Sequence, residues 1–313
     1  IRNTSVGYNS MTSCTTGGYN TVIGYKAAES TTTGANNTVC GTHALQVNTT
    51  GNYNIAVGYD ALQANTTAES NVAIGYQALD DNSTGAQNVA IGTMALDDNT
   101  TANNNVAVGY HALKANSTGH SNIGIGTNAG LAITTGTQSV AVGQNSLRTT
   151  TTGDDNTAIG CGSMYTNSTG EYNAAVGLNS LHSNTTGSYN TAVGKNAMYT
   201  NSTASNNTGI GYNALYSNTT GANNIAVGNY ALSVNTTGGN STAVGYATLD
   251  AQTTGEHNVA VGYEAGTDIT TGFYNTLIGN RAGKDLTTAG YTTAVGMDSL
   301  YVATTGNYNT AIG

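Results

Sequence analysis

The sequence contains no proline and no tryptophan, and only 7% of its residues are charged. Apolar residues are not depleted, however, because they recur at fixed positions along the chain. This combination argues against intrinsic disorder, which requires few apolar positions and usually a high charge. We therefore expect an ordered protein.

Basic residues are also scarce: 7 lysines and arginines stand against 16 aspartates and glutamates, which gives a net charge of −9. Such a chain repels phosphate backbones and anionic lipids, so we do not expect nucleic acid as a partner. No apolar run approaches the roughly 18 residues that a membrane-spanning helix needs, so we expect no membrane insertion.

Candidate catalytic and metal-binding side chains are few and scattered. The three cysteines, Cys14, Cys40 and Cys161, occupy different positions of the repeat described below, so we expect neither a disulfide framework nor a zinc site. None of the five histidines shares a repeat position with another in a neighbouring repeat. We therefore expect no enzymatic activity.

Glycine occupies every seventeenth residue from Gly7 to Gly313 without one insertion or deletion. Counted from Asn3, the 17-residue unit reads N-T/V-A-V/I-G-Y-x-A-L-x-x-N-T-T-G-x-x, and we number its positions 1 to 17. A short fixed period predicts a solenoid in which each unit packs against its neighbours. We expect residues 1–313 to form one uninterrupted all-β solenoid of eighteen coils, with no linker or separate domain.

The unit predicts two short strands per coil. Positions 2 to 4 alternate β-branched and small residues, as in Val72-Ala73-Ile74, which predicts a strand with positions 2 and 4 facing the interior. Alanine at position 3 then faces outward and favours close approach of another chain. We expect a second strand over positions 8 to 13. Glycine at position 5, as at Gly75, Gly92 and Gly109, predicts a positive φ or a close backbone approach.

Positions 9 and 12 vary together. Position 9 is usually leucine or methionine and position 12 asparagine, but three repeats carry glycine at position 9 and a large aliphatic residue at position 12. The three pairs are Gly130 with Ile133, Gly266 with Ile269, and Gly283 with Leu286. Because a close-packed interior keeps its volume, we expect the two positions to face the same core space.

The asparagines at position 12, such as Asn82, Asn99 and Asn116, each precede a hydroxyl residue and a threonine and so match glycosylation acceptors. Glycans on successive coils about 4.8 Å apart would collide. We therefore favour an internal ladder of paired amides. Position 13 is always serine or threonine, and position 14 is always threonine, as at Thr84, Thr101 and Thr118, so each position forms a row of hydroxyl groups, or hydroxyl rank, along the coils. We expect one hydroxyl rank to cap the turn and the other to face solvent. Sequons at turn positions remain candidate glycosylation sites: Asn36, Asn206 and Asn240.

Four aspartates should stack in neighbouring coils: Asp80, Asp81, Asp97 and Asp98. A bound Ca²⁺ would relieve their repulsion with oxygen ligands, and no other cofactor is expected. The alternative, which we favour, is a solvated acidic patch.

Tyrosine supplies 20 of the 21 aromatic residues, and many tyrosines recur at one repeat position in neighbouring coils. Stacked pairs are expected for Tyr59 with Tyr76, Tyr172 with Tyr189, and Tyr246 with Tyr263, and a run for Tyr274, Tyr291 and Tyr308 beside Phe273. Exposed stacks could bind sugars or a neighbouring chain. The alternative, which we favour, is that they cover turn backbone and stabilise the coil stack.

The segment 88–95, Asn-Val-Ala-Ile-Gly-Thr-Met-Ala, resembles the head repeats of trimeric autotransporter adhesins. The longer form with Asn-Thr-Thr-Gly is similar to repeats of phage and large-virus tail fibres. The resemblance implies a left-handed parallel β-roll, three chains side by side, and a place on a cell or virion surface. The unit is longer than the adhesin head repeat.

The sequence supports three hypotheses about function. The first is a rigid extracellular fibre, about 85 Å long at about 4.8 Å per coil, that spaces and attaches surfaces, with host-surface glycans as candidate partners. The second is a binding module whose threonine or tyrosine ladders recognise ice or carbohydrate. The third is a filament of chains stacked end to end, since the sequence starts and ends inside a repeat.

Overall fold

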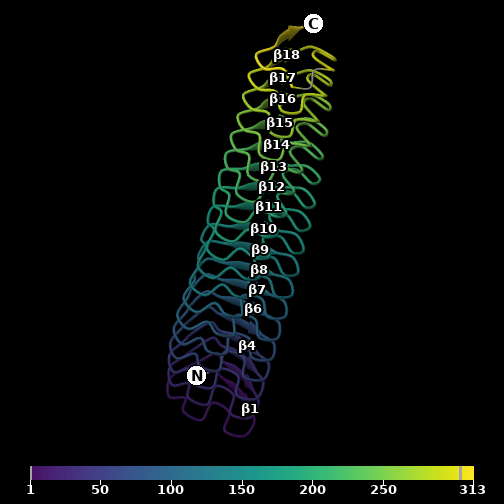
Figure 1. Cartoon of the computed structure of the whole chain (residues 1–313). Coiled ribbons are helices and arrows are strands. Elements are labelled where there is room, and N and C mark those ends of the chain that lie inside the picture. Colours follow the sequence, from purple (N-terminus) through teal and green to yellow (C-terminus); the bar gives the residue numbers. More distant parts are fainter. Residues whose placement is uncertain (1, 303–304) are drawn as a thin grey trace. The chain divides into compact units, whose positions relative to one another are not determined.

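The computed structural model describes residues 2–302 and 305–313. The chain divides into two compact units, unit 1 (Ile1–Asp155) and unit 2 (Asn156–Gly313). Within each unit, successive coils stack with their strands side by side, from purple to teal in unit 1 and from teal through green to yellow in unit 2 (Figure 1). The predicted all-β solenoid with a 17-residue coil is confirmed.

Every strand covers positions 2 to 4 of its coil, and consecutive strands within a unit pair in parallel, as Val72 pairs with Val89. The described part of unit 1 contains nine strands: β1 (Thr4–Val6), β2 (Thr21–Ile23), β3 (Thr38–Cys40), β4 (Ile55–Val57), β5 (Val72–Ile74), β6 (Val89–Ile91), β7 (Val106–Val108), β8 (Ile123–Ile125) and β9 (Val140–Val142). The described part of unit 2 contains ten: β10 (Thr157–Ile159), β11 (Ala174–Val176), β12 (Thr191–Val193), β13 (Thr208–Ile210), β14 (Ile225–Val227), β15 (Thr242–Val244), β16 (Val259–Val261), β17 (Thr276–Ile278), β18 (Thr293–Val295) and β19 (Thr310–Ile312).

The expected second strand is absent from the described coils. Positions 8 to 13 form consecutive turns instead, and non-glycine residues at positions 7 and 9 adopt positive φ, for example Met94 at 52° and Leu96 at 52°. A strand cannot accommodate left-handed residues at alternate positions. The turns still bond from coil to coil, since the Leu96 N–H donates to the Ala112 carbonyl at 3.0 Å.

The strand orientation predicted from β-branching is wrong. Position 3 faces the interior: Ala90 is fully buried, whereas Ile91 beside it is 38% exposed. The interior is narrow because Leu96 and Asn99 already fill it, so only a methyl group fits at most strands. Larger side chains at position 3 are Val22, Val39 and Leu277, all buried. Leu277 occupies the space left by two glycines: a Cβ added to Gly266 would lie 2.6 Å from the Leu277 Cδ1, and a Cβ added to Gly283 would lie 2.8 Å from the Leu277 Cδ2.

The coupled change at positions 9 and 12 is confirmed as an exchange of core volume. Ile133 is fully buried, and a Cβ added to Gly130 would lie 3.0 Å from the Ile133 Cδ1 and 2.6 Å from the Leu113 Cδ2. The aliphatic side chain at position 12 thus occupies the room that leucine takes at position 9 in other coils.

Glycine at position 5 meets both conditions that its invariance predicted. Its φ is positive in every coil, between 125° and 151°. A Cβ on Gly92 would lie 2.5 Å from the carbonyl oxygen of Gly109, so the backbones of adjacent coils approach closely there. Any side chain would force these coils apart.

Candidate functional site

A buried amide ladder runs through position 12 of each unit. The Asn99 Nδ2 donates to the Asn82 Oδ1 at 2.7 Å, and the Asn116 Nδ2 donates to the Asn99 Oδ1 at 3.2 Å. All three side chains are fully buried. A glycan could not be attached at these sequons in the folded chain.

A second amide ladder, at position 1, was missed from the sequence. The Asn88 N–H donates to the Asn71 Oδ1 at 2.9 Å, and the Asn88 Nδ2 donates to the Ala102 carbonyl at 2.8 Å. The signal was present, because nearly every repeat begins with asparagine, but we treated this residue only as the start of the unit.

The two hydroxyl ranks differ in accessibility. At position 13 the Thr100 Oγ1 donates to the carbonyl of Ser117 in the next coil at 3.2 Å, so this rank caps the turn. At position 14 Thr84, Thr101 and Thr118 are exposed. Each unit therefore presents one threonine rank to solvent.

The candidate sequons on turns are also exposed. Asn36, Asn206 and Asn240 lie at position 17 with φ near 60°. Their side chains are accessible for glycosylation, which stays a prediction.

The four aspartates lie close together, but a lysine accompanies them. The Lys114 Nζ lies 2.9 Å from the Asp97 Oδ2 and 3.2 Å from the Asp98 Oδ1. In the described ranges, no group of three or more histidine, cysteine, aspartate or glutamate side chains is placed to hold a metal ion. Lys114 therefore supplies part of the positive charge that a bound Ca²⁺ would supply in the less favoured of the two hypotheses.

Asp80 is the perturbed member of this acidic patch. Burial, followed by the charges of Asp60, Asp81 and Asp97, raises the pKa of Asp80 to about 7. Its Oδ1 is buried and accepts no hydrogen bond from the described residues. Burial and the neighbouring carboxylates also raise the pKa of Asp81.

Aromatic side chains stack along several repeat positions. The ring centroids lie 5.5 Å apart for Tyr59 and Tyr76, and 5.0 Å apart for Tyr172 and Tyr189. Sequence reasoning missed that histidines join these ladders. At position 10 four rings stack, with centroid distances between 4.8 and 5.3 Å: Tyr165, His182, Tyr199 and Tyr216.

The outer face of the strands is uncharged and mostly apolar, although position 2 is threonine in ten strands and valine, isoleucine or alanine in the others. We define the apolar strand face of each unit as the side chains at positions 2 and 4 of its strands. Position 4 carries only valine, isoleucine or one cysteine, and position 2 carries no charged residue. Ile74, Ile91 and Ile210 are each 38% exposed, and Ile225 is 44% exposed. Stacked coils therefore leave a continuous uncharged strip on each unit.

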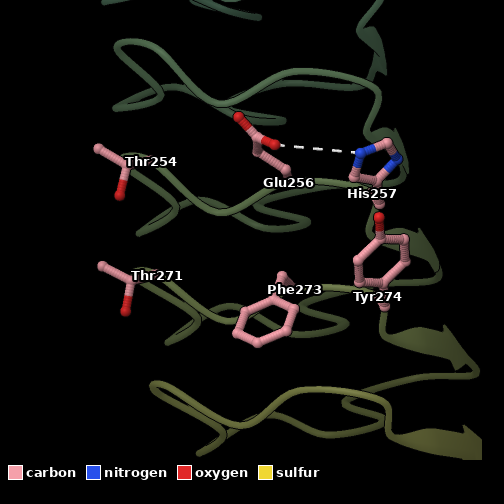
Figure 2. A pocket seen from close by; sticks show the side chains of 6 residues that line it. All are labelled: Thr254, Glu256, His257, Thr271, Phe273 and Tyr274. Atoms are coloured by element: carbon pink, nitrogen blue, oxygen red, sulfur yellow. Dashed lines mark ion pairs between the residues drawn. The ribbon is translucent and has the colours of Figure 1, made fainter.

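Unit 2 contains a pocket of about 220 Å³ across two neighbouring coils. Figure 2 shows Thr254 and Thr271 on one side, His257 and Tyr274 on the other, and Glu256 and Phe273 between them. These are positions 14, 16 and 17 of the repeat. The pocket therefore combines the exposed threonine rank with an aromatic ladder.

No protein-family model matches the chain, and no curated protein matches it significantly. The resemblance to adhesin and tail-fibre repeats thus depends on the repeat pattern alone. A search of the described residues for a helix long and apolar enough to cross a membrane finds none.

Proposed function

We propose that the chain is a structural segment of an extracellular fibre on a cell or virion surface, and that its apolar strand face packs against further copies of the chain. The observation that carries this proposal is the apolar strand face. Contiguous exposed apolar surface beyond a few hundred Å² marks interaction sites in soluble proteins.

The area of this face is sufficient for self-association. With strands about 4.8 Å apart and three residues of about 3.3 Å each, one unit presents roughly 400 to 500 Å² of projected strand face. Because each unit presents such a face, the chain carries roughly 800 to 1,000 Å² in total, which matches the ~800 Å² that one partner contributes to a stable interface. Flanking tyrosines at position 6, such as Tyr76, which is 46% exposed, would add to the contact.

The charge distribution favours a second copy as the occupant. The chain carries a net charge of −9, so two copies repel unless the surfaces that meet are uncharged. Positions 2 and 4 meet this condition in every coil. Their shared period also lets two copies align coil to coil, and three copies side by side would form a homotrimer.

The mechanical role follows from the repeat. Each coil bonds to the next through backbone hydrogen bonds and buried amides, so length grows without a new kind of contact. Such a segment would space surfaces apart and support adhesin-like attachment. This role requires no catalytic group.

Charged substitutions on the strand face test the proposal. Ile74→Lys with Val108→Lys places two charges on the apolar strand face of unit 1, and neither side chain is fully buried. Thr84→Lys with Thr118→Lys adds the same charge on the exposed threonine rank. Light scattering after size exclusion should show an oligomer for the wild type and the threonine variant, and a monomer for the strand-face variant.

Two results would contradict lateral packing. A wild type that stays monomeric at every concentration would remove self-association altogether. A strand-face variant that still assembles would show that chains associate elsewhere, for example end to end as a filament, which electron microscopy would reveal.

A further inference from the structure

We propose that the pocket formed by Thr254, Glu256, His257, Thr271, Phe273 and Tyr274 binds a neutral carbohydrate. This binding activity goes beyond the fibre role. It requires no contact between copies of the chain, so it is tested separately.

The first argument is the rigidity of the aromatic wall of the pocket, which consists of His257, Phe273 and Tyr274. The rings of His257 and Tyr274 stack with centroids 4.6 Å apart, and Tyr274 stacks on Tyr291 at 5.3 Å. Phe273 meets Tyr274 edge to face at 6.0 Å and Tyr291 at 5.4 Å. Because these neighbours fix the rings, a ligand would not have to order them.

The second argument is that this wall remains accessible. Phe273 is 38% exposed and Tyr274 is 50% exposed. Tyr274 is stacked between His257 and Tyr291, so the ring that is available to a ligand is Phe273, which meets Tyr274 and Tyr291 edge to face. Such a ring packs against the apolar C–H face of a sugar ring, and recognition pockets typically pair such surfaces with a few polar groups. The volume of about 220 Å³ lies below the ~300 Å³ of pockets for drug-sized ligands and suits one sugar ring.

The third argument is the set of polar groups around the wall. The hydroxyls of Thr254 and Thr271 are able to donate and to accept, and the Glu256 carboxylate accepts hydrogen bonds from hydroxyl groups. The Glu256 carboxylate lies beside the aromatic residues of the pocket, with its Oε2 3.9 Å from the His257 Nε2 (Figure 2). Sugar hydroxyls require this mixture of donors and acceptors.

Charge then selects among sugars. Glu256 is 55% exposed in its side chain and carries a negative charge, on a chain whose net charge is −9. Sialylated or sulfated sugars would be repelled at short range. A neutral sugar ring avoids this repulsion and uses the same hydrogen bonds.

The combination is specific to these two coils. Position 14 is threonine throughout, but position 16 is phenylalanine only at Phe273. Glu171 and Tyr172 repeat the acidic and aromatic pair at positions 16 and 17, but the next coil has Ser188 in place of phenylalanine. The surface around Glu171 and Tyr172 is therefore a matched control that lacks the phenylalanine ring.

The experiment is a glycan array of neutral, sialylated and sulfated oligosaccharides, followed by titration calorimetry with the strongest neutral binder. The variants are Phe273→Ala and Glu256→Gln, with Glu171→Gln as the control. Folding should be retained, because position 16 carries alanine elsewhere, as at Ala35 and Ala222.

We expect the wild type and Glu171→Gln to bind neutral sugars equally, and Phe273→Ala to weaken binding about tenfold or more. Glu256→Gln should weaken neutral binding and reduce the discrimination against acidic sugars. An array without neutral binders, a preference for acidic sugars, or equal affinity in Phe273→Ala and the wild type would overturn the proposal. None of these results depends on the oligomeric state.

Discussion

The exchange of volume between positions 9 and 12 predicts that two damaging substitutions will compensate each other. Gly130→Leu and Ile133→Asn together convert an exceptional coil to the consensus of its neighbours. Leucine at position 9 adopts a positive φ elsewhere, as Leu113 does at 50°, so the backbone of Gly130 at φ 61° already suits it. The amide that the second substitution introduces at position 12 would extend the ladder that ends at Asn116.

The contacts of Gly130 set the size of each single effect. A Cβ there would lie 2.6 Å from the Leu113 Cδ2 and 3.0 Å from the Ile133 Cδ1, so Gly130→Leu alone overpacks the interior and costs about 1–3 kcal/mol. Ile133 is fully buried, so Ile133→Asn alone removes aliphatic packing and costs about 2–5 kcal/mol. The double variant should unfold within about 1 kcal/mol of the wild type, so the coupling energy should be close to the sum of the two single costs, about 3 kcal/mol or more.

Urea unfolding followed by circular dichroism measures the four free energies of this cycle. The control pairs Gly130→Leu with Ile269→Asn in the other unit, where the two effects should add. Additive effects for Gly130→Leu with Ile133→Asn would refute the shared core space, whatever the size of the single effects.

Two further predictions concern the backbone and the acidic patch. Gly109 has a φ of 135°, which a residue with a Cβ rarely adopts, and a Cβ there would lie 2.7 Å from the Gly126 carbonyl oxygen, so thermal unfolding of Gly109→Ala should show a loss of about 2 kcal/mol or more. A Cβ at Gly85 would also press on the next coil, at the Ala102 carbonyl oxygen, but Gly85 has no positive φ and other coils carry alanine at position 15, so Gly85→Ala should cost clearly less. Burial and neighbouring carboxylates raise the pKa of Asp80 from 3.8 to about 7, so folding favours its protonated form and the free energy of unfolding should fall as the pH rises from about 4 to about 7. Asp80→Asn should remove this fall in the free energy of unfolding, whereas the control Asp268→Asn should leave it unchanged.

The sequence was sufficient to predict the coil length, the parallel stacking and the core pair at positions 9 and 12, because each follows from the 17-residue period. The strand orientation was not predicted correctly. β-Branched residues at positions 2 and 4 reflect a preference for strand backbone, which does not say which face is buried. Leu277 between Gly266 and Gly283 was the available signal that position 3 faces inward.

The prediction of a second strand was wrong for a different reason. Leucine at position 9 carries no mark of a positive φ. A signal was present nevertheless, because position 7 is often asparagine, as at Asn128 and Asn145, and position 9 is glycine in three repeats, and these residue types tolerate a positive φ. Inter-coil hydrogen bonds, such as that from the Leu96 N–H to the Ala112 carbonyl, hold this conformation, and they exist only once the coils have stacked. The pocket also required the structure, because positions 14, 16 and 17 of two coils form it together.

The narrow interior explains where functional variation can occur. Alanine at position 3, leucine at position 9 and asparagine at positions 1 and 12 fill most coils, and their ladders leave little room for change. Positions 16 and 17 lie outside these ladders, and their residue types vary from glycine, as at Gly18, to phenylalanine, as at Phe273, without altering the 17-residue register. A new surface can therefore arise in one coil at little structural cost, and the neighbouring coil completes it at the spacing of the sheet. Glu256 and Phe273 meet in this way, so selection for binding would act on pairs of coils rather than on single repeats.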